Sequence, residues 1–116
     1  MDYRLRKRDR IRSRKEILLL LKEGKRVENK NFRILLKKRE NNSRIAVSVK
    51  RKTVNSVKRN RIRRVLKEIF RKGRERLNGY FDIFVIVKRD LSEKKYEELE
   101  RDFFKLLGKG RILKKC

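Results

Sequence analysis

Residues 57–71, VKRNRIRRVLKEIFR, carry the strongest structural signal in the chain. Apolar side chains recur at i, i+3, i+4, i+7 and i+8, the spacing of one continuous helix face. Asn55 or Ser56 is suited to cap the start, so the pattern predicts an amphipathic helix over residues 55–76. The apolar face comprises Ile62, Val65, Leu66, Ile69 and Phe70, and the polar face comprises Asn60, Arg63, Arg64, Lys67 and Arg71.

Strand patterns flank this helix on both sides. Residues 80–87 are apolar on both faces, which is typical of a central strand that is covered on both sides. Together with the alternating residues 44–50, the helix and this strand predict a β-α-β unit. Further upstream, residues 32–37 also alternate, and the turn residues 40–43 follow them. We therefore expect residues 32–37 and 45–50 to pair as an antiparallel hairpin.

Helices are also predicted near both ends of the chain. Ser13 and Glu16 are spaced as a capping box before the apolar run Ile17–Leu21, and Gly24 is suited to end that helix. A last helix is expected over residues 92–108, beginning at a serine and ending at a glycine. The whole chain, residues 1–116, is predicted to be one domain with a basic arm at residues 1–12 and a basic tail at residues 111–116.

Composition narrows the possible functions. The 116 residues include 40 Lys and Arg but only 15 Asp and Glu, a formal net charge of +25. Such a charge favours a polyanionic partner, and nucleic acid fits better than a membrane or an acidic protein because no helix carries the Trp-rich apolar face of a membrane binder. The absence of His excludes histidine catalysis, and the single Cys, Cys116, excludes an internal disulfide. No membrane span is present, and we expect a cytoplasmic monomer.

The cationic helix face is the first candidate binding site, because arginines on a rigid helix are suited to bind successive phosphates. A second is the strand end Lys50-Arg51-Lys52, beside the start of that helix. A third is a partly apolar groove formed by Phe32, Leu35 and the Ile17–Leu21 helix, which would suit single-stranded nucleic acid. The five aspartates form no cluster near the basic helix, so no protein-borne metal nuclease centre is predicted.

The order and spacing of these motifs resemble those of the bacterial ribonuclease P protein subunit. The resemblance extends over roughly residues 4–107, and the Arg59-Asn60-Arg61 core with its trailing arginines corresponds to the signature of that family. The matching segments are Lys7-Arg8-x-Arg10-Ile11, Lys22-Glu23-Gly24, Phe32, the run 46–52, the run 57–71 and Phe81-Asp82-Ile83.

This resemblance implies an α+β fold, a single-domain α/β sandwich with a small mixed sheet. It is similar to domain 2 of ribosomal protein S5 and has a left-handed β-α-β crossover, against the usual rule. It also implies a function: binding a catalytic RNA that uses Mg²⁺ to remove the 5′ leader of precursor tRNA, with no catalytic residue in the protein. The catalytic RNA would contact Arg59, Asn60, Arg61, Arg63, Arg64 and Lys67, and the leader would contact Ile17, Leu21, Phe32, Leu35, Ser48, Lys50, Arg51 and Lys52.

The sequence departs from the family pattern at three positions. Ile17 and Leu21 stand where aromatic residues are usual, so leader contacts there would be apolar packing rather than stacking. Val54 replaces a glycine before the basic helix, which implies a turn without positive φ. Two alternatives stay open: a ribosomal or RNA-chaperone type of RNA-binding protein, and a stand-alone nuclease.

Overall fold

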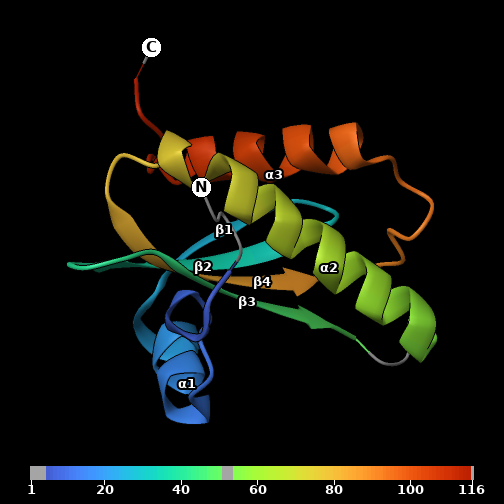
Figure 1. The fold of residues 1–116 in the computed structure, drawn as a ribbon, viewed down its shortest axis with the longest axis horizontal. Coiled ribbons are helices and arrows are strands. Elements are labelled where there is room, and N and C mark those ends of the chain that lie inside the picture. Colours follow the sequence, from blue (N-terminus) through green and yellow to red (C-terminus); the bar gives the residue numbers. More distant parts are fainter. Residues whose placement is uncertain (1–4, 51–53, 116) are drawn as a thin grey trace.

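The chain folds into three layers, with a four-stranded sheet between one helix below and two helices above (Figure 1). The computed structural model describes residues 5–50 and 54–115. The elements are the 3₁₀ turn η1 (Lys7–Asp9), α1 (Arg14–Glu23), β1 (Lys25–Glu28), β2 (Phe32–Arg39), β3 (Arg44–Val49), α2 (Ser56–Gly73), the 3₁₀ turn η2 (Arg74–Arg76), β4 (Tyr80–Val87) and α3 (Tyr96–Lys109).

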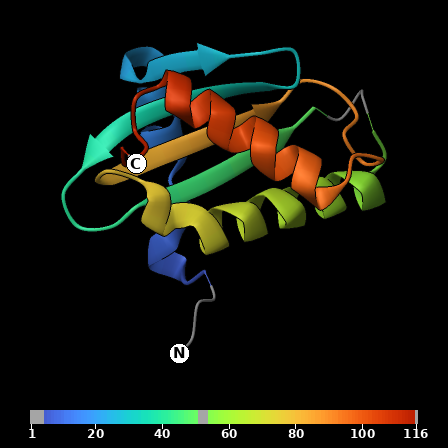
Figure 2. The ribbon, with the colours of Figure 1, turned by 90° about the horizontal axis from the view of Figure 1, so that it is seen from above.

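The sheet has the strand order β1-β2-β4-β3, and its topology corrects one prediction. The parallel β3–β4 pair and the helix between them confirm the β-α-β unit, and the views from the front and from above show that the crossover is left-handed (Figures 1 and 2). The predicted β2–β3 hairpin is wrong, because β4 lies between these strands and pairs antiparallel with β2. A strand that is apolar on both faces is stabilised most at the centre, where both faces are covered.

Two hydrophobic clusters hold the layers together. The larger lies above the sheet, where Phe32 and the stripe of α2 meet α3; Ile62, Leu66, Ile69 and Phe70 are each at most 1% exposed. Gly73 lets these helices approach, because a Cβ there would overlap the ring of Phe104. The smaller cluster lies below the sheet and joins α1 to it through Ile11, Leu20, Leu35 and Phe84.

The helix starts agree only partly with prediction. Asn55 caps α2, its side chain accepting a hydrogen bond from the Lys58 amide at 2.9 Å. Ser13 likewise accepts from the Glu16 amide at 3.3 Å, but the Glu16 carboxylate binds Arg44 on β3 instead of reaching back to Ser13.

The last helix differs from prediction at both ends. α3 begins at Tyr96 instead of Ser92, because Ser92 is held in a turn by two hydrogen bonds to Asp90. The helix continues through Gly108 and ends at Lys109.

Two segments are more ordered than the sequence suggested. β1 was not predicted, since Lys25–Glu28 has no apolar alternation. The predicted basic arm is, from Leu5 onward, built into the fold: the Ile11 amide donates to the Ile45 carbonyl at 3.1 Å, and Arg10 forms a parallel bridge with Ile45. The arm therefore covers part of the open edge of β3.

The substitution of Val54 for the usual glycine is compatible with the loop. Among the described residues, Arg111 is the only non-glycine residue with positive φ, so Val54 avoids that region. Its side chain is 8% exposed and packs into the larger cluster. Of the helices described, none has the length and apolar character needed to span a bilayer.

Candidate RNA interface

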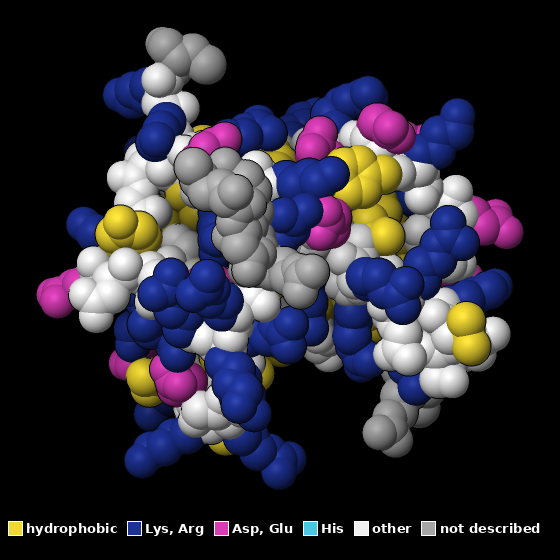
Figure 3. All heavy atoms as spheres, viewed as in Figure 1, with side chains coloured by type: hydrophobic (Ala, Val, Ile, Leu, Met, Phe, Trp, Pro, Cys, Tyr) yellow, Lys and Arg dark blue, Asp and Glu magenta, His cyan; other side chains and the backbone are white. Residues whose placement is uncertain are grey.

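Outside its apolar stripe, α2 presents a row of cations without acidic partners among the described residues. Within residues 5–50 and 54–115, no carboxylate lies within 4.0 Å of Arg59, Arg61, Arg63, Arg64 or Lys67. Ion pairs on this helix fall outside the row: Lys58 lies 3.8 Å from Asp90, and Glu68 pairs with Arg71. Lys and Arg side chains cover much of the face that includes α2, and carboxylates are scattered singly (Figure 3).

The members of the row are held differently. Arg59 is half-buried, and its Nη1 donates to the Val54 carbonyl at 3.1 Å, so it fixes the loop before the helix. Asn60 accepts from Arg63 Nη1 at 3.2 Å. Arg61 and Arg64 are exposed on the rigid helix. These two guanidinium groups are the most available for phosphate contacts.

A groove lies between the arm, α1, the edge strand β3 and α2, and it encloses about 430 Å³. Apolar side chains from α1 and β4 line one part of it, and cations from the arm and α2 line the other. The lining residues are Arg10, Ile11, Arg12, Ile17, Ile45, Ala46, Val47, Ser48, Arg63, Lys67 and Phe84.

The electrostatics of the groove favour an anion. Burial lowers the pKa of Lys67, and the positive charges of Arg10 and Arg63 lower it further. No carboxylate in the described part of the chain pairs with any of these three cations. A phosphate between them would relieve their mutual repulsion, and the apolar wall would accept a base or sugar.

The structure places the predicted leader-binding residues unevenly. Ile17 and Ser48 line the groove, and the predicted RNA-binding residues Arg63 and Lys67 join them there. Leu21 is 48% exposed on α1 outside the groove lining, and Lys50 is exposed after the end of β3. Arg51 and Lys52 lie outside the described residues.

Two predicted groove residues are corrected. Phe32 is fully buried in the larger cluster, on the face of the sheet opposite the groove. Leu35 lies on the correct face, but α1 covers it and leaves it 3% exposed. Residues 32 and 35 are separated by an odd number along one strand, so their side chains must point to opposite faces.

Seven groove residues were not predicted as site residues: Arg10, Ile11, Arg12, Ile45, Ala46, Val47 and Phe84. Phe84 could have been found from the sequence. Residues 80–87 are apolar on both faces, and this pattern predicts that each face of the strand, including the face with Phe84, is covered by another element. The arm residues carried no such signal, since their position depends on contacts with β3 and α2 that are distant in sequence.

Comparison with known proteins shows which family the chain belongs to. The model of the ribonuclease P family matches residues 5–111. The chain belongs to the ribonuclease P protein family. It is 40% identical to the ribonuclease P protein component of Thermotoga maritima, over 84% of this chain and 82% of that protein, and 37% identical to that of Syntrophus aciditrophicus, over 90% and 89%.

Solved structures agree with this assignment. The ribonuclease P protein from Thermotoga maritima superposes with a TM-score of 0.77 at 34% identity, covering 86% of this chain and 96% of that one. The Staphylococcus aureus protein, at 22% identity, shares the fold with a TM-score of 0.82 over 91% and 98%. As a ribonuclease P protein, the chain is the protein subunit of a tRNA-processing enzyme whose catalytic role is carried by RNA.

In this ribonuclease P family member, a charged network fixes α1 against the sheet. Arg44 Nε donates to Asp82 at 2.8 Å, and its Nη2 contacts Glu16 on α1. The hydrogen bonds that Arg44 donates to Asp82 are the main cause that raises the pKa of Arg44, and Arg44 in turn lowers the pKa of Glu16. The network fixes the N-terminal part of α1, and with it Ile17 in the groove wall.

A second network fixes the arm, and its centre is Asp9, which is 4% exposed. Asp9 accepts from the Arg6 amide at 3.0 Å, lies 3.3 Å from Arg74 at the end of α2, and accepts from Asn42 at 3.4 Å. Burial alone would raise the pKa of Asp9, but these donors together lower it below 3.8. Because Arg10 is the next residue, Asp9 positions the first cation of the groove.

Replacing Asp9 with asparagine tests this positioning. We expect Asp9→Asn to lower the free energy of unfolding by about 2 kcal/mol and to speed tryptic cleavage in the arm. A carboxylate with a lowered folded pKa contributes stability that is present above its unfolded pKa of 3.8 and is lost as pH falls through its folded pKa. The wild type should therefore lose this part of its stability in acid, and the variant should lack that part at every pH.

The matched control is Asp90→Asn, which removes an exposed carboxylate that contacts Ser92 and Lys58. It should leave arm cleavage unchanged. Equal arm cleavage in Asp9→Asn and wild type, measured under native conditions, would contradict the role of Asp9.

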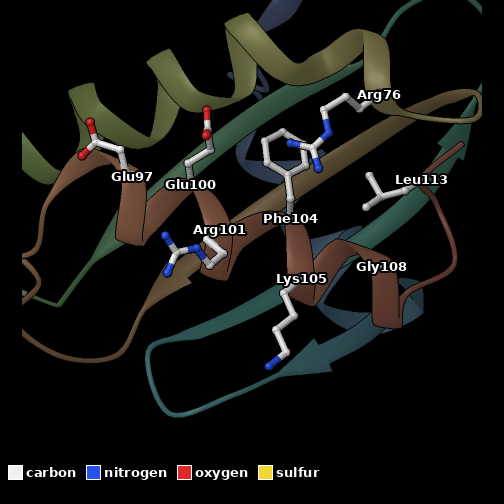
Figure 4. A pocket seen from close by; sticks show the side chains of 8 residues that line it. All are labelled: Arg76, Glu97, Glu100, Arg101, Phe104, Lys105, Gly108 and Leu113. Atoms are coloured by element: carbon white, nitrogen blue, oxygen red, sulfur yellow. The ribbon is translucent and has the colours of Figure 1, made fainter. Parts of the chain in front are cut away.

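A larger hollow of about 580 Å³ lies beside α3, on the other side of the sheet from α1 (Figure 4). Arg76 lies over the Phe104 ring at 3.9 Å, and Arg101 and Lys105 share this hollow with Glu97 and Glu100. Its charges are mixed and Arg76 is already stacked on Phe104, so this hollow lacks the excess of cations found in the groove. Within the described residues, no three His, Cys, Asp or Glu side chains gather to hold a metal.

Proposed function

We propose that this subunit performs two tasks in the ribonucleoprotein: the cationic row of α2 docks on the catalytic RNA, and the groove binds the 5′ leader of precursor tRNA. The observation that supports the second task most strongly is the convergence of Arg10, Arg63 and Lys67 beside the apolar Ile17 and Phe84. Phosphates would contact the cations while bases or sugars pack against the apolar wall.

The first task is electrostatic. Folded RNA concentrates negative charge, and docking Arg61 and Arg64 against it would release counterions and offset phosphate repulsion. We infer that Mg²⁺ is held mainly by the RNA, which is where the phosphodiester chemistry takes place. The protein would reduce the Mg²⁺ concentration that the RNA requires, and it would work as a cytoplasmic monomeric subunit.

The second task is discrimination. Mature tRNA has no leader, so a site for the leader contributes affinity for the precursor only. The subunit would thereby favour substrate over product without contacting the scissile bond. None of the remaining surface needs to take part in chemistry, in keeping with the absence of histidine from the sequence.

Reconstitution with a bacterial catalytic RNA tests both tasks. At low Mg²⁺, adding the protein should stimulate leader removal, and the complex should bind precursor tRNA more tightly than mature tRNA. The protein alone should cleave nothing. Absence of stimulation together with equal affinity for precursor and mature tRNA would contradict the proposal, and specific cleavage by the protein alone would revive the stand-alone nuclease.

A further inference from the structure

Tyr80 is an exposed aromatic residue outside the groove. It is the first residue of β4 and is 50% exposed, while the other aromatic side chains in residues 5–50 and 54–115 are buried or partly buried. Beside it is a hollow of about 500 Å³. The lining residues are Ser43, Arg74, Glu75, Leu77, Asn78, Gly79, Tyr80 and Lys114.

The fold places two cations beside this ring. Arg74 is held 3.3 Å from Asp9, and the backbone at Lys114 is held by its amide, which donates to the Arg76 carbonyl at 2.8 Å, while the Lys114 side chain is exposed. Glu75 is the single carboxylate in the lining and Asp9 already pairs with Arg74, so Lys114 is the lining cation without an acidic partner among the described residues. An exposed ring, an apolar floor at Leu77 and a nearby lysine are elements that suit a nucleotide of single-stranded RNA, with its base stacked and its phosphate beside the ammonium group.

The hollow and the groove are connected through β3 and the arm. Ser43 immediately precedes β3, and residues 45–48 of that strand line the groove, so Ser43 and the farthest of these groove residues are about 16 Å apart at most at the usual rise of a strand. The arm passes between them: Asp9 binds Arg74 of the hollow, and the next residue, Arg10, lines the groove. The exposed arginines of α2 lie toward the other end of the helix from Arg74.

We propose that Tyr80 is a stacking site for a nucleotide of the 5′ leader that has passed beyond the groove. This inference rests on the proposed function, because it requires the leader to occupy the groove first. A leader that extends from the RNA-bound end of α2 through the groove leaves it on the side of the arm where Tyr80 lies. The site would therefore add affinity only for precursors whose leaders are long enough to reach it.

Precursor tRNAs whose leaders lengthen by one nucleotide at a time provide the test. The affinity of the reconstituted holoenzyme should rise first as the leader fills the groove and again when it reaches Tyr80. Tyr80→Ala should abolish only the second rise, a loss of roughly tenfold, because stacking on an aromatic ring contributes on that order. Tyr80→Phe keeps the ring and should keep the second rise.

The outcomes separate this inference from the proposed function. If the wild type binds all leader lengths and mature tRNA equally, the leader groove itself is refuted. If the wild type responds to leader length but Tyr80→Ala does not differ from it, the stacking site alone is refuted. Weaker binding of Tyr80→Ala at every length, mature tRNA included, also refutes the site, because it shows general damage or a contact with the tRNA body.

A fluorescent variant gives a direct readout. The sequence contains no Trp, so Tyr80→Trp introduces a single reporter. Its emission should be quenched by long-leader precursors and not by short-leader ones. A matched reporter at Glu98→Trp, on the exposed side of α3, should respond to neither. Unchanged emission of the Tyr80→Trp variant with a long leader bound would overturn the proposal.

Discussion

Replacing Arg61 and Arg64 together with alanine is expected to weaken binding of the catalytic RNA by about a hundredfold at moderate salt. Each exposed guanidinium lacks an acidic partner among the described residues, so each is available to a phosphate, and a charged hydrogen bond contributes about 1.5 kcal/mol. Losing two phosphate contacts should also reduce the slope of log affinity against log salt by about 1.5. Titrations at several salt concentrations measure both quantities.

The control for this prediction removes the same charge elsewhere. Arg101 and Lys105 are exposed on α3, and replacing both with alanine lowers the net charge equally. This pair should change affinity only slightly. Equal weakening by the two double variants would show that total charge, and not docking of α2, determines binding.

Replacing Lys67 with glutamine is expected to reduce the preference for precursor over mature tRNA by about tenfold, because a leader phosphate loses one charged contact. Binding of the catalytic RNA should change less. Lys72→Gln is the matched control: it removes a lysine from the same helix that lies 3.7 Å from Glu68 and outside the groove. A loss of preference in both variants would contradict the assignment of Lys67 to the leader site.

The same lysine predicts a pH dependence. Burial and the neighbouring cations lower the pKa of Lys67, so it loses its proton before an ordinary lysine does as pH rises toward 10.5. Leader affinity in the wild type should decline over this range. Lys67→Arg should bind the leader without that decline, because a guanidinium stays charged throughout. An identical pH profile for the two proteins, obtained by rapid fluorescence titration, would rule out titration of Lys67.

The sequence was sufficient for elements whose signal is local. The apolar stripe of α2 predicted both the helix and its buried side. Five apolar residues at helical spacing form one face, and the helix can bury that face only by turning it toward the sheet. The apolar faces of β4 likewise predicted its central place. Much of the cationic row followed from the same stripe, since Arg63, Arg64 and Lys67 occupy the opposite side of the helix.

Strand pairing was not accessible in the same way. Alternation shows that a strand has two different faces, but it does not identify its neighbour. β2 and β3 are close in sequence and separated by turn residues, which favoured a hairpin, yet β4 lies between them. β1 had no alternation at all; its pairing with β2 in register Lys25 to Leu36 creates the strand.

The groove was predicted only in part. Ile17 and Ser48, which were assigned to the leader, line it, and so do Arg63 and Lys67, which were assigned to the catalytic RNA. Phe32 was grouped with Leu35 in one groove although the parity of their strand places the two side chains on opposite faces. The contribution of the arm depends on a buried aspartate and on one backbone hydrogen bond to β3, and neither leaves a pattern in the sequence.

Directed cleavage of the RNA by a probe on α2 tests the central claim most directly. Cys116 is the only cysteine in the sequence, so replacing it with serine allows a single tethered iron chelate to be placed at Arg64→Cys or at Arg101→Cys. From position 64, hydroxyl radicals should cut a defined region of the catalytic RNA, and from position 101 they should cut it weakly or not at all. Strong cleavage from α3 with none from α2 would contradict the docking of α2 on the RNA.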